Sequence, residues 1–215
     1  MLHLRMIARE GFFAVVVTLA AGVASVYFKA IYSAAFAFGL SALLFWLYRV
    51  PRRRPPAVPL GLLSPVDGRV AFVESYEDPW LKRPVLRISI EVRPPGITVF
   101  FSASEGKVKH YWTNFGPFGE ARLGRSLSAS PDCYAVNVQS DEGDDVVMAA
   151  SSRWPVSRCR FDRSPGERIG QGGRFGFVYF ASSFELLAPV DATPRVEVGD
   201  HVRAVSSLLA ELKGD

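Results

Sequence analysis

The stretch VLRISIEVRPPGITVFFSASEGKVKHYW, residues 85–112, holds three short apolar runs separated by turn-forming residues. The runs are Val85–Val92, Ile97–Phe101 and Gly106–Trp112, and Pro94-Pro95-Gly96 interrupts the chain between the first two. β-Branched and aromatic residues are frequent in them, and each run is shorter than an ordinary helix. This part of the chain therefore predicts three β-strands.

The same pattern continues in both directions from this stretch. Further strand-like runs are Arg69–Glu74, Tyr134–Val138, Val146–Ala150, Phe175–Phe180 and Phe184–Leu187. The turn signals between the runs are Asp67-Gly68, Asn114–Gly119, Asp141–Asp145 and Gly170–Gly173. For Ser206–Leu212, helix and strand both remain open. Many short strands with regular turns predict a mainly β fold, a single sandwich- or barrel-like domain over residues 61–215.

A different pattern occupies the N-terminal part of the chain. From Gly11 to Tyr48 the sequence is almost wholly apolar, and Lys29 is its only charge. A membrane span needs roughly 20 apolar residues, so this block predicts two transmembrane spans, about Phe12–Phe28 and Ala30–Tyr48. Residues 1–50 then form a helical hairpin that anchors the protein, and residues 51–60 form a linker rich in Pro and Arg.

The charge distribution indicates an orientation for this anchor. Residues 1–60 contain seven Lys or Arg and one acid, Glu10, whereas the remainder contains 18 basic and 20 acidic residues. Positive charge flanks both ends of the apolar block, at Arg5 and Arg9 before it and at Arg49 and Arg52–Arg54 after it. By the positive-inside rule, both ends face the cytoplasm, and the connection near Lys29 either faces the other side or stays shallow in the bilayer. This predicts the cell (inner) membrane with the β domain on its cytoplasmic side. These arginines either fix topology alone or also attract anionic lipids.

Several functions are excluded by the same residues. The β domain is slightly acidic, so nucleic-acid binding is not expected. Cys133 and Cys159 lack metal-ligand spacing, and the three histidines, His3, His110 and His201, lie far apart, so no metal site is predicted. P-loop, dinucleotide-binding, HExxH and GxSxG motifs are all missing. The histidines and cysteines are expected to be structural or solvent-exposed.

Two stretches could carry chemistry. The first is LSPVDGRV, Leu63–Val70, and the second is YFASSFELLAP, Tyr179–Pro189. Taken alone, the first is a turn that enters a strand. In the second, Ser182 and Ser183 interrupt an apolar strand, which alone indicates a bulge or an exposed polar pair. Spacing by itself favours these structural interpretations.

Together with the apolar hairpin, the order of these stretches resembles the phosphatidylserine decarboxylase family, in its short form. Leu63–Val70 is similar to the family's SPADGRV motif, and the resemblance covers nearly the whole chain. Its other matching stretches are Arg9-Glu10-Gly11, Arg87–Ile90, Gly106–His110, Gly166–Arg168, Gly173–Gly176 and Val198–Val202.

The resemblance implies an enzyme that is made as a zymogen and cuts its own backbone before an internal serine. That serine becomes a pyruvoyl group, whose ketone takes up the serine amine of the lipid and serves as an electron sink for decarboxylation. The family's Gly-Ser cleavage pair matches Ala181-Ser182, so Ser182 takes the pyruvoyl position. Asp67 matches the acidic residue that assists cleavage. The implied partners are the membrane, a phospholipid substrate and the chain's own cleaved C-terminal fragment.

Two departures from the family pattern fall at these chemical positions. Thr98 occupies the place of a family histidine, and threonine cannot shuttle protons near neutral pH as imidazole does. Ala181 replaces the glycine before the reactive serine, where backbone freedom helps an acyl shift. Two alternatives therefore stay open beside the active decarboxylase. One is a non-catalytic, unprocessed relative that binds lipids or partners at the membrane, and the other is an enzyme for another amino lipid.

Overall fold

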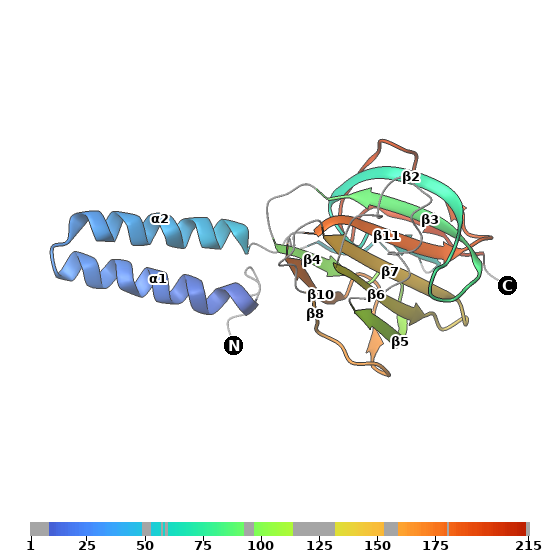
Figure 1. Cartoon of the computed structure of the whole chain (residues 1–215), viewed down its shortest axis with the longest axis horizontal. Helices are drawn as coiled ribbons and strands as arrows, with labels where there is room; N and C mark the ends of the chain where they lie inside the picture. Colours follow the sequence, from blue (N-terminus) through green and yellow to red (C-terminus); the bar gives the residue numbers. More distant parts are fainter. Residues whose placement is uncertain are drawn as a thin grey trace. The chain divides into compact units, whose positions relative to one another are not determined.

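The apolar N-terminal block forms two helices, α1 (Arg9–Tyr27) and α2 (Ile31–Leu47), in a computed structural model of the chain (Figure 1). The structure describes residues 9–48, 53–56, 58, 60–92, 97–113, 132–152, 159–179 and 181–213. Lys29, with a φ of 56°, turns the chain between the helices. Small residues allow the helices to pack closely, because a Cβ at Gly22 would lie 3.0 Å from the ring of Phe38.

The helices occupy the positions predicted for the two transmembrane spans, but the prediction that they span the membrane is not supported. Among the described residues, no helix has both the length and the apolar character needed to cross a bilayer. Helix α1 has 19 residues, but its first two, Arg9 and Glu10, are charged, and helix α2 has only 17 residues. A full crossing takes roughly 20 apolar residues.

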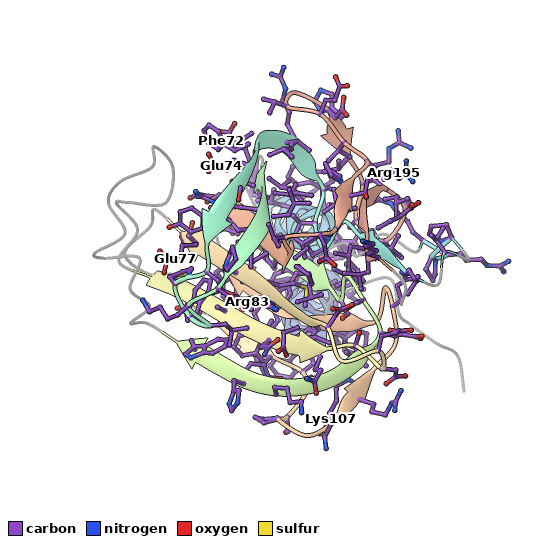
Figure 2. The ribbon with its side chains drawn as sticks, turned by 90° about the vertical axis from the view of Figure 1, so that its right-hand side faces the viewer. Phe72, Glu74, Glu77, Arg83, Lys107 and Arg195 are labelled. Atoms are coloured by element: carbon purple, nitrogen blue, oxygen red, sulfur yellow. The ribbon has the colours of Figure 1, made fainter. Side chains whose placement is uncertain are left out.

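The rest of the chain, from Arg53 to Asp215, is a second unit that consists of β-strands. Its main sheet has eight antiparallel strands in the order β13-β2-β3-β11-β7-β6-β5-β9. The sheet curls strongly in both views of the molecule (Figures 1 and 2). The strands are β2 (Gly68–Glu77), β3 (Pro84–Glu91), β5 (Gly106–Thr113), β6 (Asp132–Gln139), β7 (Asp145–Ser152), β9 (Arg168–Ile169), β11 (Ala181–Pro189) and β13 (His201–Val202).

Two small antiparallel sheets complete this unit. One has the order β4-β10-β8, with β4 at Ile97–Phe101, β10 at Arg174–Tyr179 and β8 at Cys159–Phe161. The other has the order β1-β14-β12, with β1 at Gly61–Leu63, β14 at Leu208–Glu211 and β12 at Thr193–Pro194. The main apolar core draws side chains from all three sheets, including Ile88, Phe100 and Leu209.

The opposite face of the main sheet carries a smaller apolar cluster and several buried polar residues. Val85, Val147 and Leu187 belong to this second cluster, and Trp80 and Trp112 pack against it. Residues on a strand alternate between faces, so Arg87 and Ser89 on β3 and Glu185 on β11 share this second face. These three polar residues are described below with the candidate site.

The prediction of a mainly β fold is confirmed, with a curled half-barrel sheet as its centre. Each of the eight predicted runs corresponds to a long strand, and Ser206–Leu212 contains the strand β14. The short strands β1, β8, β9, β12 and β13 were not predicted, because two or three residues leave no period to detect. Some predictions concern residues that the structure does not describe. These residues are His3, Arg49, Pro51, Arg52, Pro59, Pro94–Gly96, Asn114–Gly119 and Phe180.

Candidate functional site

Ser182 lies near the start of β11, where the pairing of this strand with β7 is irregular. Ala181 is opposite Ser152 and Ser183 is opposite Ser151, so the register shifts by one residue at Ser182. This arrangement is a β-bulge, which interrupts the ladder and redirects the bulged residue. The bond between Ala181 and Ser182, predicted to be cleaved, thus lies where backbone pairing is broken.

Other contacts hold the bulge in place. The carbonyl oxygen of Ser182 accepts a hydrogen bond from the backbone N–H of Val92, at 3.1 Å. The methyl group of Ala181 belongs to the main core, so an alanine is accommodated at this position. The hydroxyl groups of Ser183 and Ser151 are hydrogen-bonded to each other at 2.7 Å. The Ser182 side chain itself is half-buried.

Asp67 lies in the turn before β2, and its carboxylate has two partners. The Arg53 guanidinium forms a two-pronged ion pair with it, and the backbone N–H of Ala204 donates to its Oδ1 at 2.8 Å. Arg53 also donates to the carbonyl oxygen of Ala204, at 3.1 Å. The next residue is glycine for a steric reason, because a Cβ at Gly68 would lie 2.4 Å from a backbone oxygen of β3.

Strand register brings the two predicted catalytic positions to the same end of the sheet. Arg69 on β2 is opposite Glu91 on β3, and Glu91 is opposite Ser183 on β11. Two strand spacings therefore separate Arg69 from Ser183, about 10 Å. Asp67 precedes Arg69 by two residues and Ser182 precedes Ser183, so both lie at this end.

Thr98 lies on β4, in the neighbouring three-stranded sheet. It is half-buried and pairs with Val178 on β10, the strand that leads through residue 180 into β11. Thr98, at the family's histidine position, thus lies opposite a residue that precedes Ser182 by four positions. A hydroxyl group, however, stands where the resemblance implies an imidazole.

A buried ion pair lies on the second face of the sheet, three residues beyond Ser182. Arg87 donates from Nε to Glu185 Oε1 at 2.9 Å and pairs with the same oxygen through Nη2. Arg87 also pairs with Glu74 at 3.0 Å and lies 4.6 Å from the ring centre of Tyr76. Figure 2 labels Glu74 on β2. Burial raises the pKa of Glu185 to about 7, although Arg87 opposes the rise.

Two polar atoms beside this pair have no hydrogen-bond partner within the described residues. They are Oε2 of Glu185 and Oγ of Ser89, which is its cross-strand neighbour on β3. Both residues are 0% exposed. Buried atoms of this kind usually bind ordered water, and the two lie close enough on adjacent strands to share one. Sequence reasoning missed this pair, although an acid inside an apolar strand was its signal.

The cysteines and the two described histidines lie outside the ion pair of Arg87 and Glu185. His110 and His201 are exposed, and His3 lies outside the described residues. Burial raises the pKa of the Cys133 and Cys159 thiols, which are unpaired and remain protonated at neutral pH. Within the described ranges no group of His, Cys, Asp and Glu could hold a metal ion.

A surface cleft opens beside Asp67, with a volume of about 410 Å³. Its lining comes from the linker, the turn before β2 and the strand β13. The lining residues are Arg53, Asp67, Gly68, His201, Val202 and Arg203.

Comparisons with known proteins agree with the resemblance. The phosphatidylserine decarboxylase family profile matches residues 40–210. A phosphatidylserine decarboxylase proenzyme of Aromatoleum aromaticum is 30% identical over 215 residues, 96% of each chain. The proenzyme of Nitrosomonas europaea is 31% identical over 180 residues, covering 80% of this chain and 83% of its own length. No solved structure matches significantly.

Proposed function

Because this chain belongs to the phosphatidylserine decarboxylase family, we propose that it converts phosphatidylserine to phosphatidylethanolamine at a membrane. The proposal includes self-cleavage between Ala181 and Ser182. The observation that carries it is the bulge at Ser182, at the same sheet end as the Asp67 turn. The names of the similar proteins support the reaction class, and the word proenzyme in those names agrees with processing.

The residues around Ser182 fit a pyruvoyl group formed there. The pairing of β11 with β7 is already irregular between Ala181 and Ser183, so a new chain end at this point disrupts little of the ladder. The Val92 N–H would keep residue 182 attached to the sheet after cleavage, through its carbonyl oxygen. When formed, a pyruvoyl group supplies a ketone that binds the lipid amine and withdraws electrons as carbon dioxide leaves.

The chain's own side chains would perform the self-cleavage. The Ser182 hydroxyl oxygen would attack the Ala181 carbonyl carbon, so that an ester C–O bond forms, the peptide C–N bond breaks and the freed Ser182 nitrogen takes up a proton. Loss of the Ser182 Cα proton would then break the ester bond to Cβ, which releases Ala181 as a carboxylate and leaves a dehydroalanine. Its imine form would take up water and release ammonia, which gives the pyruvoyl group. The hydroxyl proton must leave during the attack, and Asp67 is the predicted acceptor at this end of the sheet. A positioned general base contributes ~10²–10⁴-fold to such a step. The partly exposed Asp67 carboxylate must first leave Arg53 or act from beside it.

The hairpin supports a membrane location for this reaction. Of the 18 large apolar side chains that are exposed among the described residues, 16 lie between Phe12 and Trp46. An apolar surface of this extent is typical of contact with lipid or with another protein. A hairpin keeps both of its ends on one side of a bilayer, whatever depth it reaches. The basic residues that follow it favour the cytoplasmic side of the cell membrane.

A second function is favoured by Thr98. Without an imidazole at this position, the chain lacks the proton carrier that the family uses, and the Arg53 pair occupies the Asp67 carboxylate. A non-catalytic relative would remain one full-length chain and would act by binding lipids or partners at the membrane.

One experiment separates the two functions. The full-length protein is purified in neutral detergent, and its mass is followed over time after synthesis. Self-cleavage predicts a C-terminal fragment that begins at residue 182, blocked by a carbonyl group that borohydride reduces with a change in mass. A stable 23.7 kDa chain would rule out the processed enzyme and leave the binding module.

Matched variants locate the cleavage site. Ser182→Ala should abolish cleavage, whereas Ser183→Ala, at the adjacent residue, should leave it largely intact. Asp67→Asn should slow it, because the amide accepts no proton. Normal cleavage in Ser182→Ala would show that the reactive serine lies elsewhere. Incubation of the processed protein with phosphatidylserine vesicles then tests for phosphatidylethanolamine.

A further inference from the structure

The cleft beside Asp67 gathers cationic side chains in a unit that has no overall positive charge. Arg53, His201 and Arg203 line it from the linker and from the segment around β13. From Arg53 to Asp215 the unit contains 20 Lys or Arg and 20 acidic residues, so two arginines and a histidine around one acid are a local excess of nitrogen donors.

The three side chains differ in what they contact. The Arg53 guanidinium is held by Asp67 and by the Ala204 carbonyl oxygen. The side chains of His201 and Arg203 are exposed and have no hydrogen-bond or ion-pair partner within the described residues. The backbone N–H of Arg203 donates to Ser207, which fixes the main chain beneath the guanidinium. Two donors are therefore available to a ligand, and a third lies next to them.

A phosphate ester suits these donors better than other anions. Arginine presents a planar fork of N–H groups that matches two phosphate oxygens, and an imidazole adds a further donor at its side. Asp67 also faces the cleft, so a ligand with a cationic group next to its anion would find partners for both. A phosphodiester linked to an amino alcohol or an amino acid has this pattern of charges.

We propose that this cleft binds the phosphodiester of a phospholipid headgroup, through Arg203 and His201. The choice of ligand class rests on the proposed function, since that function makes a phospholipid the substrate. Asp67 connects the cleft to the predicted self-cleavage site, because it lies at the sheet end that also holds Ser182. Inorganic phosphate would find the same donors, so the experiment must distinguish a phospholipid headgroup from a free phosphate ion.

Binding of soluble headgroups to the full-length chain tests the proposal without interference from the apolar hairpin. Protein in neutral detergent is titrated with glycerophosphoserine by calorimetry, as wild type and as Ser182→Ala, which keeps processing out of the measurement. The double variant Arg203→Gln/His201→Gln should bind glycerophosphoserine about tenfold more weakly or worse, because charge-assisted hydrogen bonds are lost. Arg160→Gln removes another exposed arginine, on β8, and should leave the affinity unchanged.

Two further probes identify the recognised group. Serine alone should bind much more weakly than glycerophosphoserine, because it lacks the phosphate. Inorganic phosphate should compete with glycerophosphoserine for the wild-type protein and should lose affinity in the double variant. The proposal is overturned if the double variant binds glycerophosphoserine as the wild type does, if serine binds equally well, or if inorganic phosphate binds and glycerophosphoserine does not.

The outcomes for this cleft and for the proposed reaction are independent. A chain that never cleaves itself but binds glycerophosphoserine through Arg203 and His201 would refute the decarboxylase and keep the cleft. A chain that cleaves itself normally and shows no binding that depends on these residues would refute the cleft and keep the decarboxylase.

Discussion

Two arginine–carboxylate pairs flank the predicted reaction site, and they differ in burial. In the Arg53–Asp67 pair the Asp67 side chain is 51% exposed, whereas in the Arg87–Glu185 pair the acid is 0% exposed. An exposed pair contributes little to stability, because water and salt screen it. A buried pair is costly to break, since the remaining charge is left without compensation. The exposed pair can therefore rearrange during function, and the buried pair must stay formed.

The largest expected effect comes from removing one partner of the buried pair. Arg87→Met leaves Glu185 in the sheet interior without its main counter-charge, which should lower the free energy of unfolding by about 3–5 kcal/mol. Urea denaturation followed by tryptophan fluorescence measures this loss. The double variant Arg87→Met/Glu185→Leu should recover most of it, because no charge is then buried. An equally unstable double variant would show that packing, and not charge, explains the first result.

The next effect is a pH dependence that comes from Glu185. Its pKa is raised from an ordinary value of 4.5 to about 7. Between pH 4.5 and pH 7, Glu185 is therefore protonated in the folded chain, whereas in the unfolded chain it has lost its proton. The stabilisation of the folded chain by this bound proton is fully present below pH 4.5 and is lost as the pH rises through 7. It amounts to on the order of 3 kcal/mol in total. Denaturation at several pH values measures it.

Glu185→Gln provides the comparison for this pH dependence. The variant cannot titrate at residue 185, so the difference in stability between wild type and variant should change steadily from pH 4.5 to pH 7. A constant difference over this range would mean that Glu185 does not titrate there. Glu74→Gln serves as the control, because Glu74 contacts the same arginine but is largely exposed.

A smaller effect is expected at the exposed pair, and it concerns rate. If Arg53 positions the Asp67 carboxylate, Arg53→Gln should slow self-cleavage about tenfold, the worth of one charge-assisted hydrogen bond. Arg53→Lys should restore part of the rate, because lysine keeps the charge. The time course of fragment formation by mass spectrometry measures both variants.

Arg54→Gln is the matched control for that measurement. Arg54 is the next residue and is exposed, and its loss changes the linker charge equally. Equal rates for Arg53→Gln and Arg54→Gln would show that linker charge matters and that the contact with Asp67 does not. Faster cleavage in Arg53→Gln would instead mean that the pair restrains Asp67.

The sequence predicted the strands of the fold better than it predicted the site. Runs such as Val85–Val92 are visible because buried strands are rich in β-branched residues over several positions. The bulge at Ser182 was one of two structural interpretations of the Ser182-Ser183 pair, and register alone decided between them. Pairs such as Arg53–Asp67 join segments 14 residues apart, and Arg87–Glu185 joins segments 98 residues apart. Such contacts depend on strand order, which a single sequence does not encode locally.

The N-terminal helical hairpin shows the opposite limit. Composition located both helices to within a few residues, because a long apolar block such as Gly11–Tyr48 is typical of helices that contact lipid. It could not fix where each helix starts and ends, and those ends decide whether a helix is long enough to cross a bilayer.

The smallest expected effect is the change in stability on loss of the exposed pair. Arg53→Gln should lower the free energy of unfolding of the β unit by only about 0–1 kcal/mol, and the loss should shrink further in high salt. Urea denaturation at low and high ionic strength measures it, with Arg195→Gln, which breaks the exposed pair with Glu211, as the control. A loss above ~2 kcal/mol that persists in salt would mean that Arg53 fastens the linker to the segment at Ala204. The contrast between a mobile exposed pair and a fixed buried pair would then no longer hold, and Asp67 would have to act from within a rigid contact.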